Sequence, residues 1–402
     1  MQQSPIEQKN IEFIKLLIEN EKETHILREA IKQGNLKRVK FLVEHSANVN
    51  EKYEHNRTPL HIAIGFKRLE IAKFLIEKGA DVNAKIEHHG KDDLTPMHLA
   101  VFAKTTEFLE LLINNNALIN ERESIEGHTP LHLAALYGNT SVLQALVGKG
   151  QNIEDVDNNG RIALFLALRQ CTEQKNDSRV EVIEYLINKL KADVTKKDNN
   201  NNTVLFFAAN NCPGKVVELI IKKFKENFGE GKLKDFFHHK NVDGVDALDI
   251  ALNSGNEEVI KVLRSYGADI ENKVNGESRL FRSVKENDTR KVELLLENGA
   301  FADTADDYDT TPIYFAIRNG NIDINNLLLK YNASVNLNEK EYGLSPLHTA
   351  ALNNRKEIAH VLLKNGANLY AQTNNGMDVI DISEEQSLIQ LYLKDAGLAL
   401  II

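Results

Sequence analysis

Histidine is the residue type in this sequence whose spacing could support chemistry. Four histidines stand at the same place in a short motif that returns along the chain; they are His61, His98, His132 and His348. An imidazole titrates near neutral pH, so it can transfer protons or bind a metal ion. The sequence contains no H-E-x-x-H motif, no paired C-x-x-C and no EF-hand loop to accompany these histidines. We therefore expect no metal site.

The other reactive side chains are two histidine pairs and two cysteines. The pairs His88-His89 and His238-His239 are adjacent, so their side chains diverge on a strand and share no face of a helix. Cys171 and Cys212 take equivalent positions in neighbouring copies of the motif. Packed helices lie about 8–10 Å apart, whereas a disulfide needs Cα atoms within about 7 Å. We expect two free thiols and, without a signal peptide, a reducing cytoplasmic compartment.

No catalytic signature accompanies these residues. The sequence lacks a P-loop, a G-x-G-x-x-G after a strand, a G-x-S-x-G elbow and the kinase motifs. It also leaves no non-repeat stretch long enough for a separate catalytic domain. We therefore expect a non-enzymatic protein that uses no cofactor.

The histidines belong to a repeating pattern that must position every other element of the chain. Its clearest copies are Thr58-Pro-Leu-His-Ile-Ala63, Thr95-Pro-Met-His-Leu-Ala100, Thr129-Pro-Leu-His-Leu-Ala134 and Ser345-Pro-Leu-His-Thr-Ala350. Aligned on the last residue of the pattern, the copies end at Ala30, Ala63, Ala100, Ala134, Ala167, Ala208, Ala251, Ser283, Ala316, Ala350 and Ser383. A unit of about 33 residues cannot bury its apolar face alone, so it must stack on its neighbours.

Each copy predicts two short helices joined by turns. In the copy at 127–150, Thr129 can cap the first helix, and Pro130 stands at the first helical position, where a missing N–H costs nothing. The second helix covers residues 140–149, with apolar residues at helical spacing, and Gly150 closes it as a C-cap. A hairpin-like finger then leads to the next copy.

The T-P-L-H-x-A motif with a period of about 33 resembles the ankyrin-repeat family over residues 23–395. The resemblance implies an all-α solenoid of about eleven helix-turn-helix repeats with finger turns. It also implies that the fourth-position histidines hydrogen-bond to backbone between adjacent repeats. The expected organisation is an N-terminal capping helix at 1–22, ankyrin repeats 1–10 at 23–375, and a degenerate C-terminal capping repeat and tail at 376–402. The ten repeats are expected at about 23–52, 56–89, 93–124, 127–157, 160–197, 201–242, 244–273, 276–306, 309–339 and 343–373.

Repeats five to seven depart from the pattern. Their tetrapeptides keep neither the proline nor the histidine, and extra residues enter near 171–179 and between 226 and 241. Insertions in a solenoid go to loops, so Phe236, Phe237, His238 and His239 could form a binding loop. The alternative is loop drift with both phenylalanines packed on the adjacent repeat, and this second interpretation is favoured.

The charge balance argues against two classes of partner. The formal net charge of −9 opposes the extended basic stripe that binding to a phosphate backbone requires. The apolar stretch 398–402 is far too short to span a bilayer. We expect no nucleic acid and no membrane insertion, and a protein or peptide as the ligand.

The resemblance also implies where such a ligand would bind. Ankyrin repeats hold partners with their finger tips and with two residues after the Ala-x pair of the inner helix, all facing one concave groove. Carried onto this sequence, the expected partner-binding residues are Phe66, Phe102, Leu136, Tyr137, His55, Arg57, Asp92, Leu94, Glu126 and His128. A second candidate contact set consists of Tyr308, Asp309, Tyr342 and Leu344. The groove should change from apolar in repeats two to four to polar in later repeats.

The sequence thus predicts a monomeric, non-enzymatic scaffold that binds a protein or an extended peptide. Its Lys-, Asn- and Ile-rich composition is similar to that of AT-rich genomes, including intracellular bacteria that secrete ankyrin-repeat effectors. A host-directed effector, acting in the host cytosol, is therefore a hypothesis for its setting. Two alternatives stay open: a homo-oligomeric architectural scaffold, and an enzyme or enzyme subunit with a site in repeats five to seven. The enzyme site would lie around Cys171, Cys212, His238 and His239.

Overall fold

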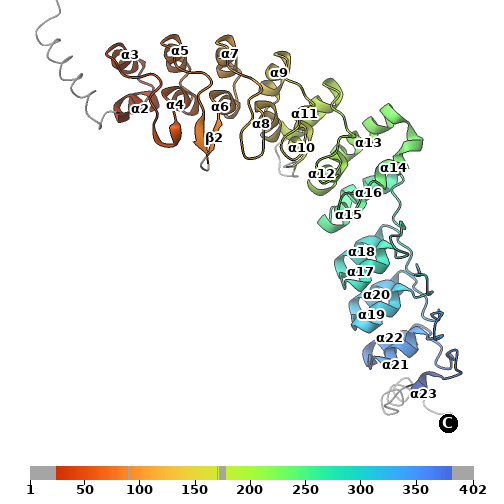
Figure 1. Cartoon of the computed structure of the whole chain (residues 1–402). Coiled ribbons are helices and arrows are strands. Elements are labelled where there is room, and N and C mark those ends of the chain that lie inside the picture. Colours follow the sequence, from red (N-terminus) through yellow and green to blue (C-terminus); the bar gives the residue numbers. More distant parts are fainter. Residues whose placement is uncertain (1–23, 89–90, 170, 172–177, 383–402) are drawn as a thin grey trace, which may run out of the picture. The chain divides into compact units, whose positions relative to one another are not determined.

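The computed structural model describes residues 24–88, 91–169, 171 and 178–382. The chain divides into two compact units: unit 1 comprises residues 1–229 with 240–244, and unit 2 comprises 230–239 with 245–402. In each unit, pairs of short helices stack side by side, with inner and outer helices in separate rows (Figure 1). The N-terminal capping helix expected at 1–22 lies outside the described residues, and so does most of the expected C-terminal cap.

Unit 1 carries its helices in alternating order along the described chain. The inner helices are α2 (Thr24–Lys32), α4 (Pro59–Gly65), α6 (Pro96–Phe102), α8 (Pro130–Leu136), α10 (Ala163–Leu168) and α12 (Val204–Asn211). The outer helices are α3 (Leu36–Glu44), α5 (Leu69–Glu77), α7 (Glu107–Asn114), α9 (Thr140–Gly148), α11 (Ser178–Glu184) and α13 (Gly214–Phe228). A 3-10 turn at Glu54–Asn56 and a π-helical turn at Tyr185–Lys189 complete the helical elements described in this unit.

Strands β1 (Ile86–His88) and β2 (Lys91–Leu94) form an antiparallel pair in one finger of unit 1. Ile86 is paired with Leu94, and the register shifts after Ile86. The finger carrying β2 projects from the row of inner helices (Figure 1). The fold is therefore helical, with a small hairpin as an elaboration of a finger.

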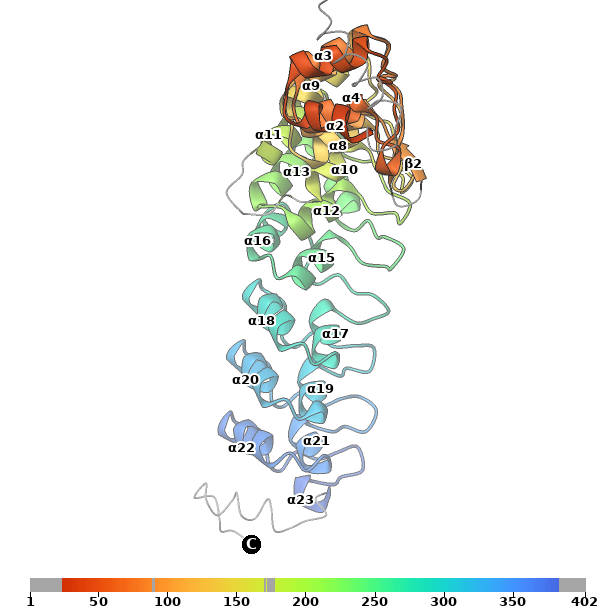
Figure 2. The same ribbon diagram turned by 90° about the vertical axis from the view of Figure 1, so that its left-hand side faces the viewer.

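Unit 2 begins with a 3-10 turn at Glu230–Lys232 and helix α14 (Leu233–Phe237). Its inner helices are α15 (Ala247–Ser254), α17 (Arg279–Lys285), α19 (Pro312–Asn319) and α21 (Pro346–Leu352). Its outer helices are α16 (Glu257–Ser265), α18 (Thr289–Glu297), α20 (Ile322–Lys330) and α22 (Lys356–Lys364), and a last short helix is α23 (Val379–Ile382). Figure 2 separates outer helices, inner helices and finger loops of this unit into three columns.

The inner helices begin where the repeated motif predicts. Thr129 precedes α8 with extended backbone, and its side chain accepts from the N–H of His132. His132 returns the interaction through its ring nitrogen, which completes a capping box, and Pro130 occupies the first helical turn. The same capping box precedes α4, α6 and α21. The motif therefore sets helix starts through local backbone chemistry.

The core is a seam of small and aliphatic side chains between the rows. The alanines that end the motif are fully buried, as at Ala63, Ala100 and Ala134. Helix α10 is buried at all six of its residues. Because alanine adds little bulk, the backbones of successive inner helices can approach closely and bury the aliphatic residues around them. Each repeat is thus stabilised by its neighbours.

The irregular segment of residues 226–241 is helical at its centre. Phe236 and Phe237 lie in α14, and both are buried. This arrangement agrees with the packed interpretation of Phe236 and Phe237, while Phe228 at the end of α13 is 50% exposed. The positions of Phe236 and Phe237 therefore do not support the alternative in which these two residues form a free binding loop.

The finger tips of neighbouring repeats are joined by backbone hydrogen bonds. In unit 1, the N–H of Asn158 donates to the carbonyl of Glu126 at 2.8 Å, and that of Asn199 donates to the carbonyl of Asn159 at 2.8 Å. In unit 2, the N–H of Lys340 donates to the carbonyl of Tyr308 at 3.0 Å. The fingers of one unit therefore form a connected edge.

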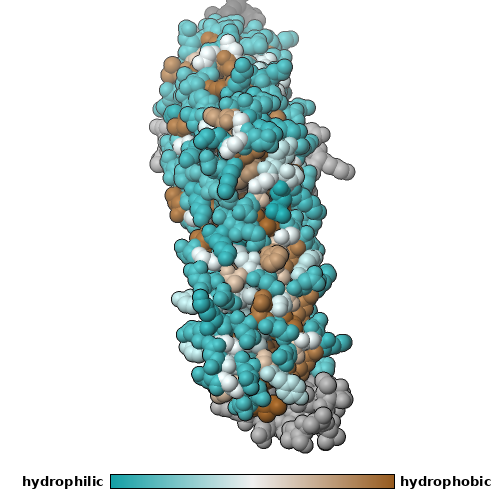
Figure 3. Space-filling model, turned by 90° about the vertical axis from the view of Figure 1, so that its right-hand side faces the viewer, coloured by the Kyte–Doolittle hydropathy of each residue, from teal (hydrophilic) through white to brown (hydrophobic). Residues whose placement is uncertain are grey.

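The surface of the chain is mostly hydrophilic on the face drawn in Figure 3, where hydrophobic side chains lie in separate patches. Exposed large apolar residues are expected in a thin array because it cannot enclose all of them. Those that recur at the same place in successive repeats are of interest for binding.

Candidate binding surface

Three aromatic residues lie at the ends of successive inner helices of unit 1. Phe66 follows α4, Phe102 is the last residue of α6, and Tyr137 follows α8. Their exposed fractions are 47%, 40% and 44%. Tyr137 is followed by Gly138, and Leu136 beside it is half-buried. We call Phe66, Phe102 and Tyr137 the aromatic strip.

Two members of the aromatic strip contact each other and remain open to solvent. The ring centroids of Phe102 and Tyr137 lie 4.9 Å apart with an interplanar angle of 71°. This edge-to-face geometry is favourable for aromatic pairs and holds both rings in place. Phe102 and Tyr137 therefore pack against each other and are still partly exposed.

Basic side chains accompany the aromatic strip. Lys67 follows Phe66 directly, and Lys104 follows Phe102 by two residues. Both lysines are exposed, and both have backbone φ near +60° in the turn after the inner helix. The strip thus combines apolar rings with positive charge.

The finger residues expected to assist binding differ in exposure. His55 and Arg57 are exposed, and His55 has φ +60° in the turn at Glu54–Asn56. Leu94 is half-buried in strand β2. The backbone of Asp92 also belongs to β2, but the structure does not describe the side chain of this residue.

The prediction that His128 belongs to the binding surface is wrong, because its side chain is buried. Its side chain is only 6% exposed, so it does not lie free at a finger tip. Its imidazole lies between two carboxylates, with Nδ1 3.5 Å from Oε1 of Glu123 and Nε2 3.4 Å from Oδ2 of Asp157. Glu126 is half-buried and is also engaged within the protein. The sequence could not reveal this burial because Asp157 belongs to the next finger.

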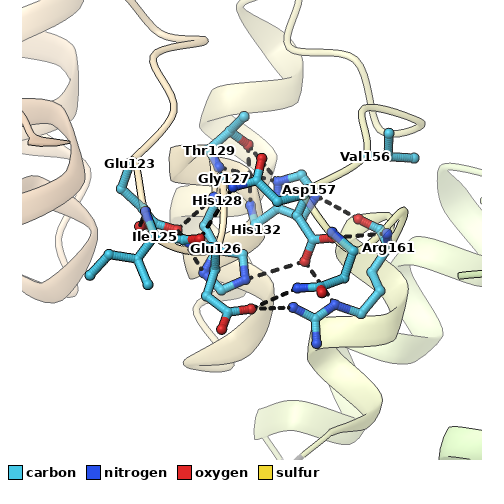
Figure 4. Close-up of polar contacts among 12 residues, drawn as sticks. Glu123, Ile125, Glu126, Gly127, His128, Thr129, His132, Val156, Asp157 and Arg161 are labelled. Carbon is cyan, nitrogen blue, oxygen red and sulfur yellow. Dashed lines mark hydrogen bonds and ion pairs between the residues drawn. The ribbon is translucent and has the colours of Figure 1, made fainter. Parts of the chain in front are cut away.

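A polar cluster joins the two fingers around His128 (Figure 4). We call Glu123, Glu126, His128, Asp157 and Arg161 the finger clasp. Arg161 Nε donates to Oδ2 of Asp157 at 2.8 Å, and its Nη2 donates to Oε2 of Glu126 at 2.7 Å. Oε1 of Glu123 accepts from the backbone N–H groups of Glu126 and His128. Arg161 therefore bridges carboxylates from two successive fingers.

The electrostatics of the clasp depend on Asp157. Burial alone would raise the pKa of this carboxyl, but hydrogen bonds from His128 and Arg161 lower it to about 2. Asp157 therefore stays ionised at neutral pH and holds the guanidinium in place.

Three potential metal ligands occur in the finger clasp. Ligand atoms of Glu126, His128 and Asp157 all lie within 4.8 Å of one another. However, Arg161 already donates to an oxygen of each carboxylate. A cation would have to displace this guanidinium from both oxygens, so the arrangement is better suited to joining repeats than to holding a metal.

Two of the four motif histidines, His98 and His132, hydrogen-bond to the next repeat, whereas no such bond is found for the buried Nε2 atoms of His61 and His348 within the described residues. The backbone N–H of Thr129 donates to Nδ1 of His132 at 3.3 Å, so the remaining proton stands on Nε2. Nε2 then donates to the carbonyl of Arg161 in the next repeat at 3.0 Å. Nε2 of His98 likewise lies 3.3 Å from the carbonyl of His128. These contacts agree with the backbone link that the resemblance implies.

The two cysteines are unbridged and buried. Cys171 and Cys212 are 2% and 1% exposed, and they hydrogen-bond to each other through their sulfurs. Burial raises the pKa of the Cys212 thiol, and the hydrogen bond with Cys171 adds to this effect. An activated nucleophile needs a lowered pKa and access, so Cys212 has neither property.

Unit 2 contains an ionic triad around the buried Arg279 that was not predicted from the sequence. Arg279 is 3% exposed, and its guanidinium donates to the carboxylates of Asp246 and Asp249. Asp246 caps α15 and Asp249 completes its capping box. In this repeat the histidine position of the motif is Asp249, and Arg279 stands at the proline position of the next copy. The presence of an acidic residue at one motif position and a basic residue in the next copy was the sequence signal that could have predicted this ion pair.

These features define a class of protein: a helical repeat array that carries inner helices, outer helices and fingers in each of its two units. The family profile described as "Ankyrin repeats (3 copies)" matches residues 5–86, 97–198, 171–274 and 280–373. A second profile, "Ankyrin repeats (many copies)", matches 66–113. Together the matches cover more than half of the sequence, so the chain belongs to the ankyrin-repeat family.

Individual relatives resemble parts of the chain. It is 25% identical over 241 residues to "Ankyrin repeat protein nuc-2" of Neurospora crassa, covering 52% of this chain and 21% of that protein. It is 34% identical over 73 residues to an ankyrin repeat-containing protein of Schizosaccharomyces pombe, covering 18% of this chain and 30% of that protein. The matches therefore span less than a third of either relative.

A solved structure supports the fold. The crystal structure of the human ASB11 ankyrin repeat domain aligns with a TM-score of 0.50 and 23% identity, covering 60% of this chain and 98% of that domain. Ankyrin repeats are generally protein–protein interaction modules, and the fold is typically a non-enzymatic binding scaffold. Among the described helices, none is long and apolar enough to cross a bilayer.

Proposed function

We propose that this protein is a non-enzymatic scaffold that binds a protein, or an extended peptide segment of one, along the inner surface of unit 1. The aromatic strip of Phe66, Phe102 and Tyr137 supplies the central contacts. Exposed finger residues such as His55 and Arg57 would contact the edge of the partner.

The observation that carries the proposal is the recurrence of exposed aromatic groups. Phe66, Phe102 and Tyr137 occupy the ends of consecutive inner helices, and each keeps at least 40% of its surface exposed. Aromatic side chains are frequent hot spots at interfaces because they bury a large area at low entropic cost. The contact between Phe102 and Tyr137 fixes two of the rings before a partner arrives.

The charge beside the strip specifies the chemistry of the partner further. Lys67 and Lys104 are both exposed, and they follow Phe66 and Phe102 closely in the sequence. A matching segment would offer apolar side chains to the rings and carboxylates to the two lysines, because complementary charges favour association. We therefore propose an acidic, amphipathic segment as the ligand.

A pull-down from host-type cell lysate tests this surface. The bait proteins are wild type, the triple variant F66A/F102A/Y137A, and a control variant L118A/V156A. Leu118 and Val156 are 52% and 40% exposed in unit 1 but lie outside the strip. A protein retained by wild type and by the control, but lost from the triple variant, supports the proposal. Equal retention by all three would show that the strip is not the binding surface.

Stability measurements separate binding from packing. Leu131 is fully buried, so Leu131→Ala should lower the free energy of unfolding by about 2–5 kcal/mol. Phe66→Ala should leave the free energy of unfolding nearly unchanged, because 47% of the residue is already exposed. Urea unfolding monitored by circular dichroism measures both. Equal destabilisation by the two substitutions would mean that Phe66 is a packing residue.

We further propose that the protein is a monomer. Its biological setting is a separate hypothesis. Sedimentation equilibrium would distinguish the monomer from the homo-oligomeric scaffold that the sequence left open. The Lys-, Asn- and Ile-rich composition is similar to that of AT-rich genomes, and the hypothesis of delivery into a host cell by an intracellular bacterium rests on this similarity. A reporter fusion that fails to reach the host cytosol during infection would argue against that setting.

A further inference from the structure

Two tyrosines stand at the tips of consecutive fingers of unit 2. Tyr308 lies between α18 and α19, and Tyr342 lies between α20 and α21. Their side chains are 64% and 58% exposed. Tyrosine is amphipathic, so a ring held this far in solvent offers both an apolar face and a hydroxyl to a partner.

The two finger tips are held in fixed conformations. The carboxylate of Asp306 accepts from the backbone N–H groups of Tyr308 and Thr310, both at 2.9 Å. In the next finger, Glu339 accepts from the N–H groups of Tyr342 and Leu344 at 2.8 and 2.9 Å. These contacts preorganise both turns, so ordering them on binding costs little entropy.

A backbone hydrogen bond joins the same two tips. The N–H of Lys340 donates to the carbonyl of Tyr308 at 3.0 Å. The two tyrosines therefore belong to neighbouring, directly connected turns of one unit.

The surroundings of these tyrosines are strongly acidic. Residues 303–310 and 336–344 contain six carboxylate side chains and one lysine, a formal charge of −5 on 17 residues, against −9 for the whole chain. Asp307, Asp309 and Glu341 are exposed beside the rings. Within the described part of the chain, neither Asp307 nor Asp309 forms an ion pair. We call Asp307, Tyr308, Asp309, Glu341 and Tyr342 the acidic tyrosine edge.

We propose that the acidic tyrosine edge binds a basic, arginine-containing extended segment of a partner protein. An arginine guanidinium can stack on a tyrosine face and donate to a neighbouring carboxylate in one geometry. Lysine shares the charge but not the planar shape, so it uses the carboxylates without the same stacking. Nucleic acid is repelled by the charge of −5, and a purely apolar segment leaves the carboxylates unpaired.

This edge is independent of the aromatic strip. It lies in unit 2, uses other residues and carries the opposite charge. Failure of either proposal would therefore leave the other intact.

Fluorescence anisotropy with labelled nona-arginine and nona-lysine peptides tests the proposal on the full chain. We expect wild type to bind nona-arginine more tightly than nona-lysine by about twofold to fivefold, the range that stacking at exposed sites supplies. The variant Y308A/Y342A should lose this preference and bind both peptides alike. The variant D307N/D309N should bind both peptides more weakly by about threefold to tenfold.

A charge-matched variant separates the edge from general attraction. E293Q/E297Q removes two exposed carboxylates from the outer helix α18 of the same unit. This control should bind both peptides nearly as wild type does. An equal loss in the control, or an unchanged arginine preference in Y308A/Y342A, would overturn the proposal. Thermal melts that match wild type establish that each variant is folded, as expected for exposed side chains.

Discussion

A histidine in this chain serves different purposes according to its neighbours. His132 is neutral and links two repeats, because its Nδ1 accepts from Thr129 and its Nε2 donates to a carbonyl of the next repeat. His128, only four residues earlier, lies between two carboxylates in the finger clasp. Residue type and spacing alone could not distinguish these environments.

The buried motif histidines should make stability depend on pH. Burial lowers the pKa of both His61 and His132 to about 4, below the ordinary value near 6.5. The unfolded chain therefore takes up protons first as the pH falls. The free energy of unfolding is therefore highest above pH 6.5, where both imidazoles are neutral in the folded and the unfolded chain. It decreases as the pH falls toward 4. Between pH 6.5 and 5, each histidine should lower the free energy of unfolding by roughly 2 kcal/mol.

Urea unfolding at pH 7 and pH 5 measures this effect. The variant H61Q/H132Q should show a weaker dependence on pH than wild type, although it starts from a lower stability. The same pH dependence in both proteins would contradict a titration of these two imidazoles.

Cys212 provides a test of the enzyme alternative. Because burial raises the pKa of its thiol, we expect Cys212 to react with a thiol reagent more slowly than free cysteine at neutral pH. The C171S variant leaves Cys212 as the single thiol. Its rate of reaction with the reagent in the native protein can then be compared with the rate in the urea-unfolded chain. Reaction faster than free cysteine would instead support an activated site in the irregular repeats.

At the scale of single elements, helix starts are secured in more than one way. Helices α4, α6, α8 and α21 use the Thr/Ser-Pro motif with its histidine capping box. Helix α15 uses Asp246 and Asp249 in the same places, and Arg279 at the start of α17 bridges both carboxylates. The inter-repeat link is therefore retained in ionic form where the motif is lost.

This ionic link should be costly to break from one side. Arg279→Met would leave the buried carboxylate of Asp246 without its counter-charge, and burial already raises the pKa of Asp246, whereas the half-buried Asp249 would keep Arg282 at 4.0 Å. We expect a loss of about 3–5 kcal/mol in the free energy of unfolding. Lys285→Met removes the exposed ion pair with Glu277 from the same helix and should cost less than about 1 kcal/mol. Similar urea midpoints for the two variants would show that the triad contributes little.

At the scale of the whole molecule, each repeat is held in place by contacts with the neighbouring repeats of its unit. Inner helices stack through buried alanines, and finger tips connect through backbone hydrogen bonds. In such an array the stability depends on nearest-neighbour interfaces, so a defect at one finger should affect the adjacent repeat first.

Gly127 tests the coupling between fingers. It has φ +74°, and a Cβ atom there would lie 2.3 Å from Oδ1 of Asn158 in the next finger. Gly150 has φ +92° but nothing within 4 Å of the corresponding position. Gly150→Ala should therefore cost about 1–2 kcal/mol from backbone strain alone, and Gly127→Ala should cost more because the next finger must also move. Equal urea midpoints would mean that the finger contact adds nothing to stability.

The sequence by itself determined the repeat, the helix pairs and their starts. These features depend on local chemistry, since Thr129 and Pro130 begin a helix through groups within one turn. Periodicity then required the helices to stack, because a single unit of this size cannot bury its apolar face.

Only the tertiary structure decided which side chains remain available for binding. His128 was placed with the binding residues by its finger position, but Asp157 and Arg161 from the next finger enclose it. Phe102 and Tyr137 contact each other across 35 residues of sequence and stay exposed. Whether a side chain is exposed, and which residue it contacts in the next repeat, depends on atoms about 30 to 35 residues away in the sequence. A motif within one repeat carries no information about those atoms.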